Sequence, residues 1–221
     1  MSHELRTPLN AIGGYAELLE MEIRGPVNHD QREYLRRIQQ SQRHLLGLVN
    51  EVLNYARIET GTVHYDMADV PVVEALHAAA GMVAPLARAG GLRFHVQACD
   101  ADLQVRADAE KLRQILVNLL SNAVKFTGPG GRVSLRCEAR DGSAWFHVRD
   151  TGMGIPADKL ESIFEPFVQV RSDLTREHEG TGLGLAISRS IAQAMDGSLA
   201  VESRKGRGST FTLRIPLAPA P

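Results

Sequence analysis

Cysteine is scarce in this sequence, since only Cys99 and Cys137 occur among its 221 residues and they lie far apart. Two cysteines at this spacing match no zinc-site pattern. In a chain of this length, two such residues are more typical of small buried side chains in a reducing compartment than of a disulfide, although one bridge between them stays open. The sequence therefore indicates neither a disulfide-rich scaffold nor a cysteine metal site.

Long hydrophobic runs and an excess of one charge are also missing. Nearly apolar stretches such as 78–86 are far shorter than the ~20 residues that span a bilayer, and Met1 is followed at once by polar residues, unlike a signal peptide. The formal net charge of −1 argues against a general nucleic-acid surface, which needs a basic excess. We therefore expect a cytoplasmic chain without nucleic-acid or membrane contacts of its own, whether a longer parent is soluble or membrane-anchored.

The first 60 residues carry two helical patterns, separated by a break at Gly25 and Pro26, after which Asp30 can cap the second helix. Gly61 follows the second pattern, where a left-handed residue is wanted. A hairpin of about 60 residues cannot enclose its own apolar seam, so residues 1–61 predict a homodimer that forms a four-helix bundle. The apolar positions are Leu5, Leu9, Ile12, Ala16, Leu19 and Ile23, then Leu35, Ile38, Leu45, Val49, Val52, Ala56 and Ile58.

Helix and strand patterns mix from residue 62 onward. Runs of strands with a few helices, without strict alternation, predict an α+β sandwich in which helices cover one face of a mixed sheet. Asp108 is a good cap for the strongest helical pattern, and Asp141-Gly142 is a hairpin signal. The predicted helices are 70–89, 108–126 and 182–195, and the predicted strands are 92–97, 103–106, 132–140, 143–150, 198–203 and 209–216.

The stretch LVNLLSNAVKFT, residues 116–127, combines a helical apolar pattern with polar side chains at regular steps. Asn118, Asn122 and Lys125 follow one another at four- and three-residue intervals, so they share one helix face. Amide oxygens can coordinate Mg²⁺ and an ammonium can meet phosphate oxygens, which suits a nucleotide ligand. A helix whose polar side merely faces water explains this stretch equally well when it is taken alone.

The stretch VRDTGMGIP, residues 148–156, places a carboxylate beside two glycines at the end of a predicted strand. Gly152 and Gly154 let the backbone approach a ligand closely. Asp150 can accept a hydrogen bond from an exocyclic amine such as that of adenine. Taken alone, the stretch is explained more simply by a strand and an ordinary Asp-Thr-Gly turn.

The stretch EGTGLGLAISRSIA, residues 179–192, leads three glycines into a predicted helix. Backbone N–H groups at a helix start attract phosphate, so Gly180, Gly182 and Gly184 suit a phosphate contact. The pattern is weak by itself, because it is neither a P-loop nor a dinucleotide fingerprint. The preceding polar residues lack periodicity, which is typical of a mobile lid.

Together, in this order, the three stretches resemble the N, G1 and G2 boxes of the sensor histidine kinases of two-component systems. IFEPFVQV, with Phe164 and Phe167, resembles their F box, and the opening SHELRTPLNAI resembles the H box that carries the phosphorylated histidine. The resemblance implies a HisKA-type dimerisation and histidine-phosphotransfer hairpin over residues 1–61. It also implies an ATP-binding catalytic domain over residues 62–221, an α+β two-layer sandwich of the gyrase, Hsp90 and histidine-kinase ATPase type.

The same resemblance assigns roles to the opening residues. His3 matches the phospho-accepting histidine, and Glu4 matches the adjacent acid that takes the imidazole proton as the ring attacks. Thr7 matches the position that helps to place water for dephosphorylation of the partner. A neutral imidazole, with a reference pKa of about 6.5, is a competent nucleophile at physiological pH.

For the nucleotide, the resemblance implies ATP with Mg²⁺, and Asn122 matches the metal ligand. Asn118 and Lys125 match residues near the metal and phosphates, and Asp150 matches the aspartate that reads adenine. Arg176 lies where a basic lid residue could reach phosphate, although this match is looser. The glycine-rich walls and the lid match Gly152, Gly154, Gly180, Thr181, Gly182 and Gly184.

These matches predict an ATP-dependent protein-histidine kinase that phosphorylates His3 and passes the phosphoryl group to an aspartate of a response-regulator receiver domain. The gyrase and Hsp90 kind of ATPase carries Glu-x-x-x-Asn on the corresponding helix, whereas this chain has Asn118 in the first position and so lacks the hydrolytic base. Two alternatives stay open, a nucleotide-binding scaffold or pseudokinase and a member in which phosphatase activity dominates.

Overall fold

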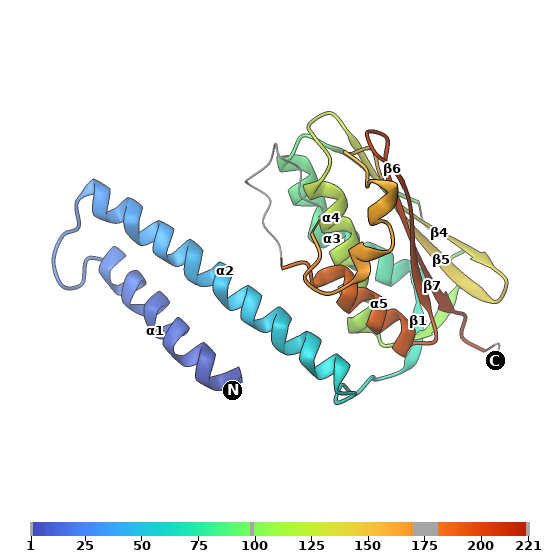
Figure 1. Ribbon diagram of the computed structural model, residues 1–221, viewed down its shortest axis with the longest axis horizontal. Helices are drawn as coiled ribbons and strands as arrows, with labels where there is room; N and C mark the ends of the chain where they lie inside the picture. The colour runs from blue at the N-terminus through green and yellow to red at the C-terminus, as the bar shows by residue number, and fades with distance from the viewer. Residues whose placement is uncertain (1, 98–99, 170–180, 220–221) are drawn as a thin grey trace. The chain divides into compact units, whose positions relative to one another are not determined.

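The computed structural model describes residues 2–97, 100–169 and 181–219 (Figure 1). The chain divides into two compact units, Met1–Gly61 and Thr62–Pro221. The first unit is a helical hairpin, and the second is a layer of helices on a mixed β-sheet. No helix in the described ranges is long and apolar enough to cross a membrane.

The hairpin consists of α1 (Ser2–Glu20) and α2 (His29–Glu59). Asn28, rather than the expected Asp30, caps α2: its Oδ1 accepts from the N–H of Gln31 at 2.8 Å, while Gln31 Oε1 accepts from the N–H of Asn28 at 2.9 Å. This reciprocal pair satisfies two backbone donors at once, which explains why the helix begins ahead of Asp30. As expected, α2 closes ahead of a glycine: the helix ends at Glu59, Thr60 is its C-cap, and Gly61 follows with a φ of +66°.

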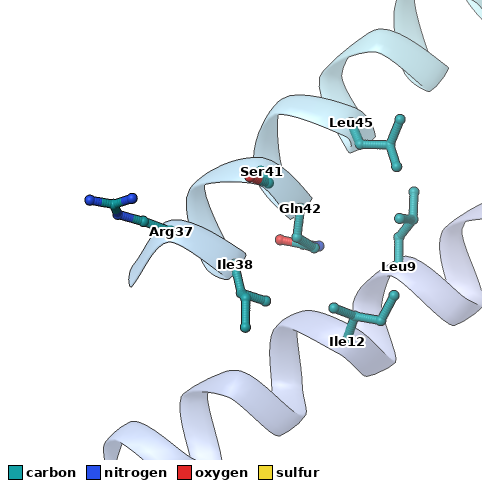
Figure 2. A pocket seen from close by; sticks show the side chains of 7 residues that line it. All are labelled: Leu9, Ile12, Arg37, Ile38, Ser41, Gln42 and Leu45. Atoms are coloured by element: carbon teal, nitrogen blue, oxygen red, sulfur yellow. The ribbon is translucent and has the colours of Figure 1, made fainter. Parts of the chain in front are cut away.

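The two helices bury only a small part of the apolar stripe that they share. Ala16 and Leu35 are buried, and Arg6 on α1 donates to Oδ1 of Asn50 on α2 at 2.8 and 3.0 Å. Leu9 and Ile12 face Ile38 and Leu45 across an apolar groove of about 340 Å³ (Figure 2). Most of the stripe remains exposed: Leu5, Ile12, Leu19, Ile23, Ile38, Leu45 and Val52.

The second unit is built on a five-stranded sheet with the order β2-β4-β5-β7-β6. β2 runs parallel to β4, and the other neighbouring pairs are antiparallel. Three helices lie on one face of the sheet, as the sequence predicts for a two-layer α+β fold (Figure 1). The strands are β2 (Arg93–Gln97), β4 (Arg132–Arg140), β5 (Ser143–Asp150), β6 (Ser198–Arg204) and β7 (Gly208–Pro216). The helices are α3 (Val72–Ala89), α4 (Ala109–Lys125) and α5 (Gly184–Ala194).

One strand of the second unit was not expected. β1 (Ala68–Pro71) pairs antiparallel with β3 (Gln104–Ala107) in a separate two-stranded sheet. The helix expected from residue 70 therefore begins at Val72, because Val70 is paired with Val105. Two short 3-10 helices, η1 (Ala157–Lys159) and η2 (Ser162–Phe164), lie in the irregular stretch before α5.

The core of the second unit lies between the sheet and its helices. Alternate strand residues point toward the helices and are buried, whereas their neighbours point to the opposite face. α4 contributes one fully buried face. The core side chains include Leu112, Ile115, Leu116, Leu119, Leu120, Val133, Leu135, Phe146, Val148, Ile191, Leu213 and Ile215.

Candidate functional site

The polar face of α4 carries Asn118, Asn122 and Lys125, and all three are half-buried at the margin of the core. Oδ1 of Asp108 caps this helix by accepting from the N–H of Lys111 at 3.0 Å, and its Oδ2 accepts from the N–H of Asp66 at 3.0 Å. The cap and the buried opposite face hold the helix rigidly. The three side chains are therefore presented together, as their spacing predicts.

Asn118 is held by α5. Its Nδ2 donates to the hydroxyl of Ser188 at 2.9 Å, and Ser188 is 2% exposed. A methyl group on Gly184 would lie 2.6 Å from Asn118 Oδ1, so only glycine permits this approach. The sequence interpretation missed Ser188, although its position one helical turn after Gly184 places both on the same face of α5.

Asp150 lies at the end of β5 and is 6% exposed. Its Oδ1 accepts from the N–H of Gly152 at 2.8 Å, and Ser209 donates from both its backbone and its hydroxyl. Burial raises the pKa of the Asp150 carboxyl above its ordinary value, and these hydrogen bonds oppose part of the rise. A buried carboxylate in such a place can accept one more hydrogen bond from a ligand amine.

The turn that follows Asp150 is packed against the end of α4. A methyl group on Gly152 would overlap the carbonyl of Phe126, and Met153 N–H donates to that carbonyl at 3.2 Å. A methyl group on Gly154 would likewise overlap the carbonyl of Arg204 in β6. These contacts bring the C-terminal end of α4 beside the buried carboxylate of Asp150, which the sequence order alone does not show.

Phe167 and Gly182 meet across the stretch that separates them in sequence. The N–H of Phe167 donates to the carbonyl of Gly182 at 3.1 Å, and both residues have positive φ values of +66° and +72°. Phe164 in η2 lies beneath the guanidinium of Arg189, 5.1 Å from its ring centre. The F and G2 stretches are therefore joined near the start of α5.

The N-terminus of α5 can serve as an anion site. No side chain among the described residues caps it, and Leu183 N–H donates to the hydroxyl of Thr181 at 3.1 Å instead. Unpaired N–H groups and the helix dipole favour phosphate at such an end. Because Asn118 contacts the first turn of α5, this end and the polar face of α4 belong to one site.

The remaining predicted residues lie in the hairpin or outside the described residues. Glu4 and Thr7 are exposed on α1, in the hairpin, and the backbone of His3 lies in the same helix. Arg176 and Gly180 lie outside the described residues.

A helical hairpin followed by this two-layer sandwich defines the class of histidine-kinase catalytic cores. Residues 107–219 match the family model for histidine kinase-, DNA gyrase B-, and HSP90-like ATPases, and residues 1–61 match the His Kinase A (phospho-acceptor) domain. The chain therefore belongs to the histidine kinase-, DNA gyrase B-, and HSP90-like ATPase family and carries a phospho-acceptor domain ahead of its ATPase domain. This combination is that of an ATP-dependent protein-histidine kinase.

Relatives and solved structures agree with this assignment. The chain is 38% identical over 221 residues to the histidine protein kinase DivJ of Caulobacter vibrioides, covering 100% of this chain and 37% of that protein. It is 40% identical over 223 residues to the circadian input-output histidine kinase CikA of Synechococcus elongatus, covering 98% and 29%. The chain thus spans well under half the length of these relatives.

Two solved structures resemble the chain over different lengths. Full-length ShkA in complex with AMPPNP superposes with a TM-score of 0.86 at 38% identity, over 99% of this chain and 45% of that one. The catalytic domain of the histidine kinase ThkA superposes with a TM-score of 0.61 at 28% identity, over 70% of this chain and 99% of that one.

Proposed function

We propose that this chain is the catalytic core of a sensor histidine kinase, which binds Mg-ATP with residues 62–221 and phosphorylates His3. The observation that carries the proposal is the convergence of Asp150, the polar face of α4 and the start of α5 within one unit. A buried carboxylate suits the adenine amine, and an uncapped helix start suits the phosphates. The likeness to ShkA, whose structure contains AMPPNP, also supports ATP as the ligand.

The donor set of α4 fits a magnesium nucleotide. Asn122 would hold Mg²⁺ through its amide oxygen, which is a ligand that this hard cation accepts, and Asn118 and Lys125 would lie near the metal and the phosphates. The metal supplies neutralisation of the phosphate charge when it is bound. Asn118 is already oriented by Ser188, which supports a role for its side chain in a preformed site. Gly152, Gly154, Thr181, Gly182 and Gly184 form the walls in this proposal, with Arg176 and Gly180 in the lid.

In the transfer step, a nitrogen of the neutral His3 imidazole forms a bond to the γ-phosphorus as the bond to the ADP oxygen breaks. Glu4 accepts the proton from the ring, and ADP leaves. The phosphoryl group then passes to an aspartate of a response-regulator receiver domain. Thr7 lies one helical turn from His3 and helps to place water for dephosphorylation of that partner.

Residues 1–61 act in this proposal as the dimerisation and phosphotransfer domain. The exposed apolar stripe on α1 and α2 supports a homodimer, because a second copy of the hairpin buries it as a four-helix bundle. Ile12 and Leu45, which are 48% and 45% exposed, lie at the groove on this surface.

Three other functions compete with autophosphorylation. Net ATP hydrolysis is disfavoured, because Asn118 stands where the gyrase and Hsp90 kind has its glutamate and a carboxamide cannot take a proton from water. A nucleotide-binding scaffold or pseudokinase is disfavoured by the presence of every expected residue. A member in which phosphatase activity dominates differs only in the balance of rates.

Incubation with γ-labelled ATP and Mg²⁺ tests the proposal, with His3→Gln as the matched control. We expect acid-labile label on the unaltered chain and none on the variant, followed by transfer to a receiver domain that contains its aspartate. Equal labelling of the variant would overturn His3 as the acceptor. Steady phosphate release without labelled protein would favour hydrolysis, and nucleotide binding without either product would favour the scaffold.

A further inference from the structure

The face of the five-stranded sheet opposite the helices is rich in arginine. Strand pairing places Arg93 beside Arg132, Arg136 beside His147, and Arg214 beside Trp145. Their sequence neighbours, such as Val133, are buried toward the helices, so the two-residue period turns the arginines outward. We name this surface the arginine face; it comprises the exposed side chains of Arg93, Arg132, Arg136, Arg140, Arg149, Arg204 and Arg214.

The charge of this face contrasts with the charge of the unit that carries it. Residues 62–221 contain 18 Lys and Arg and 18 Asp and Glu. The outward strand positions hold seven arginines but only two carboxylates, Glu138 and Glu202, and no lysine. An excess of five positive charges on one face of a neutral unit produces a local field that attracts anions.

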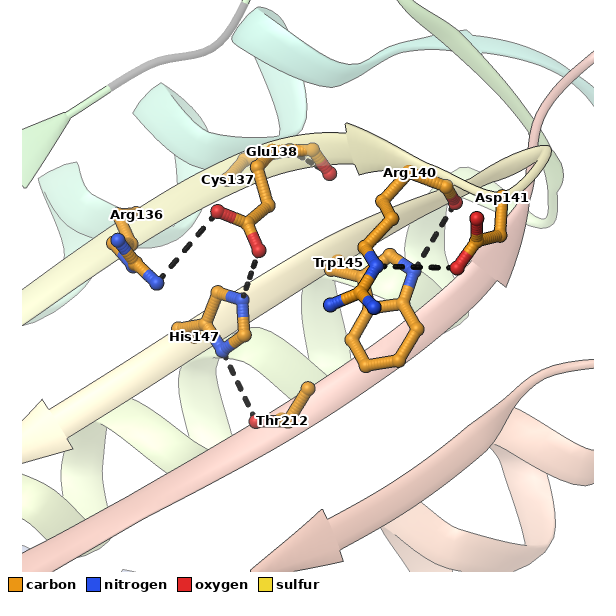
Figure 3. A network of polar contacts seen from close by, with 8 residues as sticks. All are labelled: Arg136, Cys137, Glu138, Arg140, Asp141, Trp145, His147 and Thr212. Carbon is orange, nitrogen blue, oxygen red and sulfur yellow. Dashed lines mark hydrogen bonds and ion pairs between the residues drawn. The ribbon is translucent and has the colours of Figure 1, made fainter.

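Few of these cations are neutralised internally. Glu138 lies 3.6 Å from Arg136, and Asp141 lies 3.1 Å from Arg140 (Figure 3). Within the described ranges, no carboxylate comes within ion-pair distance of Arg132, Arg149 or Arg204. These three guanidinium groups therefore keep their ion-pairing capacity for an external anion.

Two ring side chains of the face, Trp145 and His147, are engaged in contacts within it. Trp145 Nε1–H donates to the carbonyl of Arg140 at 3.2 Å, and the Arg140 guanidinium lies 5.6 Å from the indole centre. His147 stacks beside Trp145 at 6.5 Å, and its Nδ1 is 3.0 Å from the hydroxyl of Thr212 (Figure 3). These contacts occupy part of the ring surface that a nucleic-acid base would need for stacking.

The face also lacks the apolar anchors of a membrane-binding surface. None of the large exposed hydrophobic side chains in the described part of the chain lies in the five strands of the sheet. Membrane-surface elements combine basic charge with side chains that enter the lipid. The arginine face has the basic charge without such side chains, which favours a partner that supplies carboxylates to it.

We infer that the arginine face is a docking surface for an acidic polypeptide segment. The planar guanidinium group matches a carboxylate in two parallel hydrogen bonds, and arginine is favoured over lysine at such contacts. Charged rim contacts of this kind act mainly on the rate of encounter and depend strongly on salt. The inference rests on the outer face of the sheet and is independent of the nucleotide site.

The test uses the 221-residue chain and a fluorescent oligoglutamate peptide, with binding followed by anisotropy. We expect binding at about 50 mM NaCl that is lost at about 500 mM, since screening shortens the reach of charge. Combining Arg132→Glu with Arg149→Glu should weaken binding by about tenfold or more. The matched control combines Arg88→Glu on α3 with Lys111→Glu on α4, which changes the net charge equally away from the face and should alter binding by less than about twofold.

Circular dichroism and thermal melting confirm that each variant is folded, and Arg132→Gln with Arg149→Gln replaces the double charge reversal if that variant unfolds. Absence of peptide binding at low salt would overturn the inference, as would equal weakening in the control. A single-stranded oligonucleotide of matched charge and vesicles containing phosphatidylserine are the competing probes. Tighter binding of either probe through the same arginines would assign the face to nucleic acid or lipid and overturn the polypeptide.

Discussion

Gly184→Ala would place a methyl carbon 2.6 Å from Oδ1 of Asn118, well inside ordinary contact distance. Asn118 cannot simply rotate away without loss, because its Nδ2 is bonded to the buried hydroxyl of Ser188. The substitution therefore forces either Asn118 or the start of α5 to move. Both belong to the proposed nucleotide site, so the variant tests whether this contact sets its geometry.

The expected change in the free energy of unfolding follows from two opposing effects. Overpacking of a well-packed contact costs about 1–3 kcal/mol, whereas replacing glycine by alanine in a helix contributes up to about 1 kcal/mol of stability. We expect a net loss of about 0–3 kcal/mol in the free energy of unfolding. Nucleotide affinity should fall by about tenfold, which corresponds to about 1.4 kcal/mol, because the displaced Asn118 no longer fits the bound phosphates and metal.

Titration with a fluorescent ATP analogue and Mg²⁺ measures the affinity, and chemical denaturation measures the stability. Gly81→Ala is the control, since this α3 glycine has nothing within 4 Å of the added methyl; it should stabilise the chain slightly and leave affinity unchanged. In the Asn118→Ala background, Gly184→Ala should become neutral or stabilising by up to about 1 kcal/mol, because the clashing oxygen is gone and only the gain in helix propensity remains. An undiminished stability penalty in that background, or unchanged nucleotide affinity in the single variant, would refute the reasoning.

Further predictions concern the carboxylate, the serine, the cap and the hairpin. Because burial raises the pKa of Asp150, folding favours its protonated form, and stability falls as pH rises from about 3.8 through the native pKa. Asp150→Asn should flatten this pH dependence of stability in denaturant titrations. The same variant should weaken ATP binding by about tenfold or more. Ser188→Ala should weaken nucleotide affinity by about threefold to tenfold, with partial rescue by threonine, as measured by the same ATP-analogue titration. Asn28→Ala should lower the free energy of unfolding by about 1 kcal/mol in urea, with no loss if water replaces the cap. Ile12→Arg should shift the proposed dimer to monomer in light scattering, whereas an unchanged mass would place the interface elsewhere.

Local patterns in the sequence predicted much of the fold. The β4–β5 hairpin and its Asp141-Gly142 turn lie where alternation and turn chemistry place them. α4 begins after Asp108 for the same kind of reason, since a cap acts on the backbone of the next few residues. The spacing of Asn118, Asn122 and Lys125 likewise defines one face of that helix, because helical periodicity is a local property of the chain.

Local sequence patterns did not predict the contacts between distant segments. β1 was missed because Val70 and Pro71 read as the start of a helix until β3 pairs with them. Ser188 looked like one more small residue of α5, because nothing near it in sequence reveals the hydrogen bond from Asn118. The arginine face depends on the strand order β2-β4-β5-β7-β6, which brings arginines from five separate strands onto one surface.

The sequence by itself determined most of the elements of this protein and predicted its chemistry, because periodicity, caps and turns act over a few residues. The H, N, F, G1 and G2 motifs indicated the side chains that suit a phosphorylated histidine and a magnesium nucleotide. Only the tertiary structure decided which of those side chains meet, since strand pairing and helix packing join residues far apart in the chain. The close approach of Gly184 to Asn118 and the gathering of arginines on the outer sheet are consequences of that packing.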